Sequence, residues 1–423
     1  MARSVAWGVG VSLLLLAAGA GAKPFTIAAI PDTQNYMDYT HQKAEGFPFD
    51  AGDLFIGQMR FIASRLESAG GDIAFVTALG DVWQHQTLDM DPTHKARGFR
   101  RAANPTMDAE FAPTPKVFSI ELPKAREGYR LIAGKVPFSV VPGNHDYDSM
   151  WTDSNHPPKA EVKGLADVGM LHASGVSNFV SVFGADSEFF KGKQWYIASH
   201  DGGADSAQIF TAGGRRFLHI GLQFDPPNAS LEWAAKIIQA NPGLPTILST
   251  HDYMDNNGDR VPNPIIDNHA VDPEDNTPQM VWDKLISQHD QIFLVLCGHE
   301  HGQAFRTDAN RSGHPVWQIL ADYQDRAQTA KDAGVQLNPY TSGIGDGWLR
   351  LLTFDLDRPE PTVAVRTYSP HYRNFSVDQA GYAQWYKAQE KPKLSDAEFL
   401  TQDEFTFELT GFAGRFPAAA AKR

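Results

Sequence analysis

Five short apolar runs each stop at polar residues, and this pattern predicts buried strands whose ends carry a site. The runs cover residues 25–30, 73–79, 136–142, 245–250 and 292–297. Runs of this length next to Gly or Pro are typical of strands inside a sheet. The polar residues that follow are Asp32 and Gln34, then Asp81, then Asn144, His145 and Asp146, then His251, and finally His299 and His301. Because ligands bind beyond the carboxyl ends of strands in open α/β sheets, we expect these side chains to form one site.

A helix is predicted between the first two strands. Its apolar positions lie four, three and four residues apart, at Phe55, Met59, Ile62 and Leu66. This spacing places them on one helical face, and Gly70-Gly71 marks the expected end. A strand, a helix and a second strand in this order imply a parallel pair with a right-handed crossover.

The later part of the chain contains more strands than helices. Residues 194–199 and 217–223, joined through Gly213-Gly214, alternate as strands do and predict a second sheet. Two helices are expected there, after the N-cap residues Asn228 and Thr277. Further strand-like runs are 316–320, 348–354, 362–368 and 405–409. This order of elements predicts an α/β fold.

Two segments depart from the regular pattern. Residues 82–122 come directly after Asp81, are rich in loops, and carry a basic cluster that includes Arg97. We interpret them as an insertion over the site, either a substrate lid or an ordered rim. Residues 374–423 form a C-terminal extension that either packs on the domain or stands as a small appendage.

The N-terminus has the pattern of a secretory signal peptide. Arg3 precedes an apolar run over residues 9–18, and Ala20-Gly21-Ala22 offers a cleavage site after Ala22. The apolar run is too short to span a bilayer. We therefore expect residues 1–22 to be removed and the protein to be exported, either to a periplasm or out of the cell, with no integral membrane segment left.

Charge and cysteine content narrow the possible partners. The chain has 37 Lys and Arg against 50 Asp and Glu, which gives a formal net charge of −13. So acidic a chain is a poor binder of duplex nucleic acid, since phosphate contacts need a basic face. The single cysteine, Cys297, lies inside an apolar run, where we expect a core role and no intrachain disulfide.

The polar strand ends, taken together, resemble the motifs of the calcineurin-like metallophosphoesterases. That family has Asp-x-His, Gly-Asp, Gly-Asn-His followed by Asp or Glu, a single His, and Gly-His-x-His, in that order. This chain has Asp32-Thr33-Gln34, Gly80-Asp81, Gly143-Asn144-His145-Asp146, His251 and Gly298-His299-Glu300-His301. Gln34 is the departure, because the family usually has His there. The resemblance implies two mixed β-sheets packed face to face as a sandwich and flanked by helices, with residues 23–373 as the catalytic domain.

The resemblance also implies two divalent metal ions, with Mn, Fe, Zn, Mg and Ca all open. One ion would take Asp32, Gln34, Asp81 and His301, and the other would take Asp81, Asn144, His251 and His299. Gln34 offers a carbonyl oxygen, a harder donor than imidazole that suits Mn, Mg or Ca. A hydroxide bridging the two ions would attack the phosphorus of a small phosphate ester.

His145 is the catalytic acid that the resemblance implies, because it would protonate the leaving oxygen. Asp146 is expected to orient its imidazole, as carboxylates do for catalytic His. Asn144 and His85 are the predicted substrate contacts, whereas His94 and His172 have no partner that their spacing identifies. The expected function is hydrolysis of phosphate monoesters. A phosphodiesterase acting on nucleotides or lipid head groups, and a degenerate metal-binding scaffold, are the alternatives.

Overall fold

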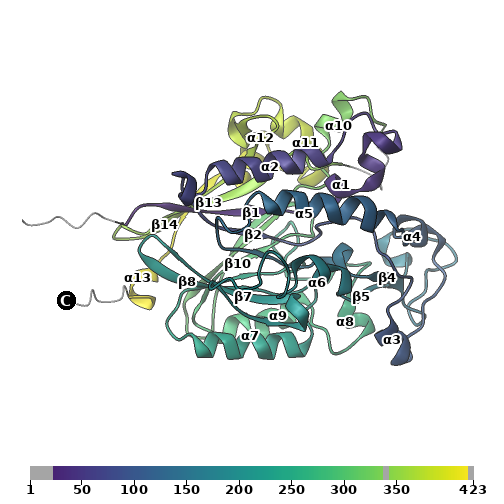
Figure 1. Cartoon of the computed structure of the whole chain (residues 1–423), viewed down its shortest axis with the longest axis horizontal. Coiled ribbons are helices and arrows are strands. Elements are labelled where there is room, and N and C mark those ends of the chain that lie inside the picture. Colours follow the sequence, from purple (N-terminus) through teal and green to yellow (C-terminus); the bar gives the residue numbers. More distant parts are fainter. Residues whose placement is uncertain (1–21, 337–342, 418–423) are drawn as a thin grey trace, which may run out of the picture.

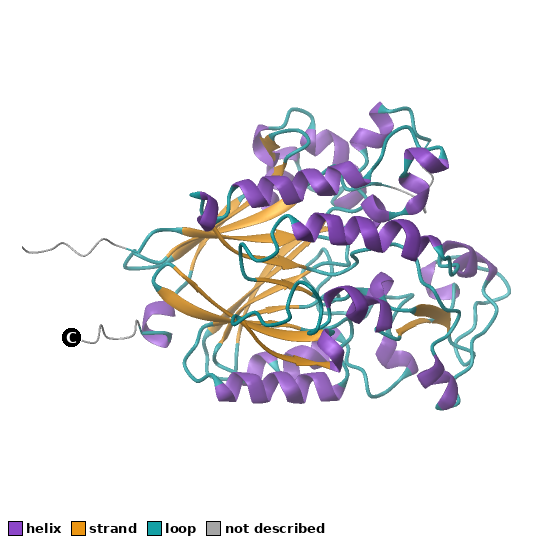
Figure 2. Ribbon diagram, in the orientation of Figure 1, coloured by secondary structure: helices purple, strands orange, loops and turns teal. Residues whose placement is uncertain are grey.

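Two seven-stranded sheets organise the computed structural model, which describes residues 22–336 and 343–417. Helices cover the outer side of each sheet, so that helix, sheet, sheet and helix follow one another (Figure 1). Figure 2 shows the same layers by type of secondary structure. The predicted signal peptide, residues 1–22, lies outside the described residues except for Ala22. The chain is therefore α/β with mixed sheets, as the order of elements predicts.

The first sheet contains the strands before Asp32, Asp81 and Asn144. Its parallel pairs are β1–β2 and β2–β3, and its other pairs are antiparallel. In spatial order the strands are β15 (Asn374–Phe375), β14 (Thr362–Ser369), β13 (Leu349–Asp355), β1 (Phe25–Ile30), β2 (Ile73–Ala78) and β3 (Phe138–Val140), with β16 (Phe405–Glu408) paired to β14.

The second sheet contains the strands before His251 and His299. Its four central strands, β12, β10, β9 and β8, are parallel, and antiparallel strands continue it on both sides. In spatial order the strands are β11 (Gly302–Ala309), β12 (Pro315–Asp322), β10 (Ile292–Cys297), β9 (Thr246–Ser249), β8 (Arg215–Gly221), β7 (Asp205–Ala212) and β6 (Tyr196–His200). Cys297 is buried in β10, as expected.

Aromatic rings join the inner faces of the two sheets. The ring of Phe25 in β1 lies 5.5 Å from that of Phe217 in β8, centroid to centroid. The rings of Phe75 in β2 and Phe210 in β7 lie 4.4 Å apart and are nearly parallel. All four side chains are buried, and each contributes roughly 1.5–3 kcal/mol to the free energy of folding. The core between the sheets thus fixes how the two sets of strand ends face each other.

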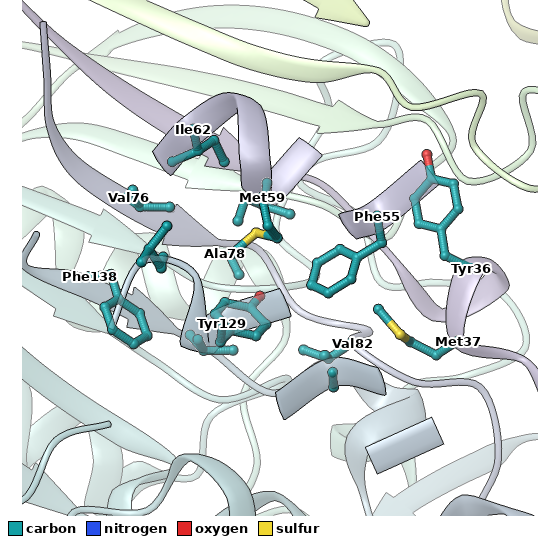
Figure 3. Close-up of a cluster of buried hydrophobic side chains, with 14 of the residues drawn as sticks. Tyr36, Met37, Phe55, Met59, Ile62, Val76, Ala78, Val82, Tyr129 and Phe138 are labelled. Carbon is teal, nitrogen blue, oxygen red and sulfur yellow. The ribbon is translucent and has the colours of Figure 1, made fainter. Parts of the chain in front are cut away.

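The longer helices pack their apolar faces on the outer sides of the sheets. Phe55, Met59 and Ile62 of α2 (Gly52–Ser64) share one buried cluster with Val76 of β2 and Phe138 of β3 (Figure 3). The described part of the chain also contains α5 (Leu122–Arg130) near α2, and α7 (Asn228–Ala240) and α9 (Pro278–Lys284) on the second sheet. The other α-helices of the described residues are α1 (Gln34–Met37), α3 (Pro92–Ala96), α4 (Pro105–Glu110), α6 (Ser177–Phe183), α8 (Asn268–Val271), α10 (Gln328–Asp332), α11 (Tyr382–Glu390), α12 (Asp396–Asp403) and α13 (Phe412–Arg415).

Two predicted helix starts differ in outcome. Thr277 caps α9, since its side chain accepts a hydrogen bond from the backbone N–H of Met280, as expected. Asn228 is the first residue of α7 and not its N-cap, because Pro227 occupies the cap position. The Asn228 side chain instead contacts Glu274 and Lys284. The prediction of the helix was correct and that of its cap was wrong.

The 82–122 insertion is ordered and packs on a two-stranded sheet, β4 (Ser149–Thr152) with β5 (Leu171–Ser174). The backbone N–H of Ala102 donates to the carbonyl of Thr152 at 2.8 Å, and that of Asp91 donates to the Ser149 hydroxyl at 3.1 Å. Its last residues, Val117–Glu121, are helical and continue into α5. The insertion is therefore anchored to the β4 strand by hydrogen bonds from its backbone N–H groups.

The C-terminal extension packs on the domain. Its strands β15 and β16 pair with β14 and widen the first sheet. Tyr382 and Phe399, on α11 and α12, are buried in the core between the sheets. Arg326 forms ion pairs with Glu390 and Asp403 of the extension. Within residues 22–336 and 343–417, no helix is both long enough and apolar enough to cross a bilayer.

Candidate metal centre

Side chains from both sheets meet where their parallel strands end. Asp81 follows β2, His251 follows β9 and His299 follows β10, and their donor atoms lie within 4.8 Å of one another. The Nε2 atom of His251 is 3.3 Å from Oδ1 of Asp81 and 3.1 Å from Nδ1 of His299. These distances bring together three of the predicted metal donors.

Asn144 and Asp32 lie beside the same histidine. The Oδ1 atom of Asn144 is 3.1 Å from Nε2 of His251, and Oδ2 of Asp32 is 3.9 Å from it. The Nδ1–H of His251 donates to the carbonyl of Leu79 at 2.8 Å. This hydrogen bond fixes the ring, so Nε2 is the nitrogen that faces the oxygens.

Gln34 is buried at the start of α1 and completes this group. Its Nε2 donates to Oδ2 of Asp81 at 3.1 Å, and its Oε1 has no hydrogen-bond partner among the described residues. A buried oxygen without a partner costs roughly 1–3 kcal/mol. We call Asp32, Gln34, Asp81, Asn144, His251 and His299 the strand-end cluster.

The charges in the strand-end cluster favour a cation. Burial and the neighbouring carboxylate of Asp322 hold the pKa of Asp32 well above its usual value. Burial alone would lower the pKa of His251, but the carboxylates of Asp81 and Asp32 outweigh it and raise that pKa. Burial and His251 lower the pKa of His299 well below its usual value, which keeps its imidazole neutral, as a metal ligand must be. The raised pKa of His251 means that positive charge beside the carboxylates of Asp81 and Asp32 is stabilising. A divalent ion would supply this charge in place of protons and would also satisfy Oε1 of Gln34, so the residues fit a metal.

His301 does not join the strand-end cluster. Its Nδ1 pairs with the carboxylate of Asp325, and its Nε2 lies 2.6 Å from the amide nitrogen of Gln324. Its side chain is 47% exposed, at the rim of the cavity described below. The donors predicted for one ion, at Asp81, Asn144, His251 and His299, are thus assembled. Those predicted for the other ion are assembled except for His301.

The backbone at two of these donors is strained. Asp81 and His299 have φ values of 48° and 70°, in the left-handed region. A residue other than glycine held there costs of order 1–3 kcal/mol, and such strain clusters at functional sites. The neighbouring glycines leave no space: a Cβ on Gly143 would lie 2.2 Å from Oδ1 of Asp81, and one on Gly298 would lie 2.2 Å from Oδ1 of Asp32.

His145 is held beside Asp81 with one ring nitrogen directed at it. Its Nδ1–H donates to the carbonyl of Gln84 at 2.7 Å, and its Nε2 lies 3.9 Å from Oδ2 of Asp81. The ring of Phe111 packs edge-on against the imidazole at 5.3 Å. The backbone and the insertion therefore fix the ring in one orientation.

Asp146 holds the turn and does not orient the imidazole, which corrects the prediction. Its Oδ2 accepts from the backbone N–H of Gly143 at 2.9 Å, and its Oδ1 accepts from those of Val82 and Trp83 at 2.8 and 3.3 Å. Asp146 thereby ties the turn after β3 to the turn after β2. The Nδ1–H of His145 donates to the carbonyl of Gln84, whereas the sequence predicted the carboxylate of Asp146 as its partner.

His85 is held in place by an acidic neighbour. Its Nδ1 lies 2.7 Å from Oε1 of Glu121, a buried carboxylate that also accepts from the backbone N–H groups of Gln84 and His85. Gln84 and Asp38 line the cavity, and donor atoms of Asp38, His85 and Glu121 lie within 4.8 Å of one another. His85 is thus held by Glu121 beside the cavity, and its contact with substrate stays a prediction.

A cavity of about 700 Å³ opens over the strand-end cluster. Part of its lining is apolar and comes from the insertion, the β4–β5 sheet and the loop before α8: Met107, Phe111, Met150, Leu171, Ile265 and Ile266. The lining also includes the acidic residues Asp38, Glu300, Asp325 and Glu390.

Two residues of the centre escaped sequence reasoning. Asp322, the last residue of β12, is buried, and its Oδ2 has no hydrogen-bond partner among the described residues. It follows the apolar run 316–320, so the strand-end pattern would have found it. The amide nitrogen of Asn263 lies 3.2 Å from Nε2 of His299, but Asn263 belongs to a loop with no periodic pattern.

The chain has similarities both to a curated protein and to solved structures. No family model matches the chain. The uncharacterized protein YvnB of Bacillus subtilis (strain 168) is 24% identical over 237 residues, which are 55% of this chain and 16% of YvnB. The chain thus spans about a sixth of that relative's length. The structure titled "GAP50 the anchor in the inner membrane complex of Plasmodium" is 9% identical, with a TM-score of 0.34 over 83% of this chain and 86% of that one. Neither similarity identifies a family.

Proposed function

We propose that this protein is a metal-dependent phosphoester hydrolase of the calcineurin-like type. The observation that carries the proposal is the meeting of Asp81, His251 and His299 within 4.8 Å, in a cavity that the imidazole of His145 also lines. A scaffold that binds metal for stability needs the donors but has no use for an oriented imidazole next to them. The combination therefore favours catalysis.

The residues divide into metal holders and a proton carrier. Asp81, Asn144, His251 and His299 would hold one divalent ion, and Asp32, Gln34 and Asp81 would hold a second. When bound, such ions lower the pKa of bound water and neutralise charge on phosphate oxygens. His145, whose Nδ1–H is committed to Gln84, would give a proton from Nε2 to the leaving oxygen. Phe111 covers one side of that ring and shields it from water.

Phosphate monoesters are the first substrate class that we propose, and the cavity lining gives phosphodiesters as a second candidate. The described lining residues include the carboxylates of Asp38, Glu300, Asp325 and Glu390 and include no Lys or Arg. A monoester, with a second pKa of about 6, carries close to two negative charges at neutral pH and meets more repulsion than a singly charged diester. The apolar part of the lining would hold the second ester group of a diester.

The test is metal removal and return, with alkyl and aryl monoesters and diesters as substrates. Chelated protein should be inactive, and Mn, Zn or Mg should restore activity to the parent but not to Asp81→Asn. Asp283→Asn, an exposed residue on α9, is the matched control and should behave as the parent. Hydrolysis by a protein shown to be metal-free would refute the mechanism, and a metal-loaded protein that cleaves none of the esters would point to a scaffold.

A further inference from the structure

A second group of possible metal donors shares no residue with the strand-end cluster. One donor atom each from His94, His172 and Asp272 lies within 4.8 Å of the others. His94 is on α3 in the 82–122 insertion, His172 is in β5, and Asp272 directly follows α8. Three segments that are distant in sequence thus bring metal-ligating side chains to one point.

His172 is the most informative member of this group. Its side chain is 1% exposed, and neither ring nitrogen has a hydrogen-bond partner among the described residues. Buried polar groups are almost always paired, so two unpaired nitrogens on one imidazole need a reason. The closest acidic atom is Oδ2 of Asp275, 3.4 Å from Nε2. The rings of Trp151 and His94 lie against the imidazole, at 5.0 and 4.7 Å.

His94 is oriented as metal-ligating histidines usually are. Its Nδ1–H donates to Oδ2 of Asp91 at 2.9 Å, which leaves Nε2 3.6 Å from Oδ2 of Asp272. A histidine that binds a metal almost always donates its other N–H to a carboxylate or a carbonyl. Zinc bonds of roughly 2.0–2.2 Å put tetrahedral donors about 3.3–3.6 Å apart. The spacings at Asp272 and Asp275 are in this range.

We propose that His94, His172 and Asp272, which we call the cap cluster, bind a zinc ion. Two imidazole nitrogens and one carboxylate oxygen give three of the four donors that zinc takes, and Asp275, whose Oδ2 lies 3.4 Å from Nε2 of His172, or a water molecule would supply the fourth. Mg²⁺ and Ca²⁺ prefer all-oxygen sites, so they fit this mixed set less well. The described lining of the cavity over the strand-end cluster includes none of these three residues, so the ion would be structural.

Acidic groups outnumber basic groups around the cap cluster. Asp91, Asp272 and Asp275 contribute three carboxyl groups, and Arg97 contributes one guanidinium. Arg97 donates from Nη1 to Oδ2 of Asp272 at 2.5 Å and lies on the outer side, with 44% of its side chain exposed. A divalent cation would therefore be attracted to the cap cluster. Arg97, which belongs to the basic cluster of the insertion, pairs with a carboxylate of the protein itself.

The ion would tie the insertion to the domain. It would connect α3 to β5 and to the segment after α8, in addition to the ion pair between Arg97 and Asp272. Leu171, the neighbour of His172 in β5, lines the cavity together with Ile265 and Ile266. Zinc in the cap cluster would therefore hold the apolar wall of the cavity in place.

The experiment measures zinc stoichiometry in the full chain with the strand-end cluster disabled by Asp81→Asn and His251→Asn. This protein, chelated and then titrated with Zn²⁺, should still bind one ion and melt at a higher temperature with it. Co²⁺ in its place should give the visible absorption of a tetrahedral site. Adding His94→Asn or Asp272→Asn should weaken binding by more than the roughly 10–100-fold that loss of an outer partner costs.

His156→Asn is the matched control, because His156 belongs to the same region and half of its side chain is exposed. It should bind zinc as the background protein does. Circular dichroism reports whether each variant is folded, and His94, which is less buried than His172, supplies the variant least apt to disturb the core. A folded background protein that binds no zinc, or one whose affinity survives His94→Asn, overturns the proposal. Zinc binding is read without any assay of hydrolysis, so failure of the proposed function would leave this result standing.

Discussion

The strand-end cluster and the cap cluster are assembled from different kinds of structure. Asp81, His251 and His299 each follow a strand of a seven-stranded sheet, so backbone hydrogen bonds fix where their side chains begin. The cap cluster draws on the five-residue α3, a two-stranded sheet and the residues after α8. Donors on a rigid sheet are positioned before any ligand arrives, which suits chemistry. Donors on separate loops gain most from a ligand that joins them, which suits a structural ion.

Replacing one histidine in each region by asparagine should give the largest difference between the two regions. His145→Asn should keep its metal content and hydrolyse alkyl phosphates roughly 10²–10⁴-fold more slowly, because it removes the proton donor. Activated aryl esters should lose less, since their leaving groups need little protonation. His94→Asn should lower the melting temperature instead of kcat. Equal losses for alkyl and aryl esters in His145→Asn would contradict its role as an acid.

The next comparison is between the carboxylates of Asp146 and Asp91. The measured quantity is the free energy of unfolding of the metal-free protein. Asp146→Asn replaces one acceptor oxygen with a donor facing backbone N–H groups, so we expect a loss of about 1.5–3 kcal/mol. Asp91→Asn, beside the cap cluster, should lower the free energy of unfolding by less. Asp91 is the N-cap of α3, and Asn caps helices about as well as Asp. Urea denaturation of both variants measures the two values. A cost at Asp91 equal to that at Asp146 would show that the turns after β2 and β3 are not specially dependent on the carboxylate.

A smaller effect is expected from Gln34→His, which changes metal preference within the strand-end cluster only. Replacing the amide oxygen with an imidazole nitrogen should shift bound metal from Mn or Mg towards Zn or Fe. Metal content after equilibration with a mixture of ions measures the shift. Asn35→His, one residue further along α1, is the control. An unchanged metal profile would mean that Oε1 of Gln34 does not ligate.

The smallest effect is expected at His200, which lies outside both clusters and serves as a reference for them. The hydrogen bond from His200 to the carboxylate of Asp205 raises the pKa of His200 above its usual value of about 6.5. A raised pKa in the folded state stabilises the protein fully below the unfolded pKa, and this stability is lost as pH rises through the folded pKa. The difference in unfolding free energy between the parent and His200→Asn should therefore be largest below about pH 6.5 and shrink as pH rises above it. A pH-independent difference would rule out the ionic contribution.

The sequence predicted the strand-end cluster better than the details around it. Asp81, His251 and His299 could be placed because each follows an apolar run, and parallel strand ends share an edge. Asp146, His301 and His85 could not, because the direction of a side chain in a turn depends on partners from elsewhere, namely Val82, Asp325 and Glu121. Strand position is a local property, whereas side-chain partners in turns are not.

The strands and the cap cluster that the sequence did not predict have the same explanation. Strand β7 contains Ser206 and Gln208, whose polar side chains are buried and form hydrogen bonds within the second sheet. The apolar pattern of this strand is therefore weak. Strand β11 lies at the edge of that sheet, and from Ala304 to Ala309 it alternates between half-buried and exposed positions, with polar and apolar residues at both. The cap cluster needs three distant segments to meet, and no spacing between His94 and His172 indicates that they do.

The two glycines packed against carboxylates restrict how this protein can change over generations. Because a Cβ at Gly143 or Gly298 would overlap the carboxylate of Asp81 or Asp32, a substitution at either glycine would force that donor to move. Position 34 has no such constraint from these glycines, so a donor atom can be exchanged there while both carboxylates stay in place. A lineage adapting to another ion should therefore vary at position 34 and keep both glycines.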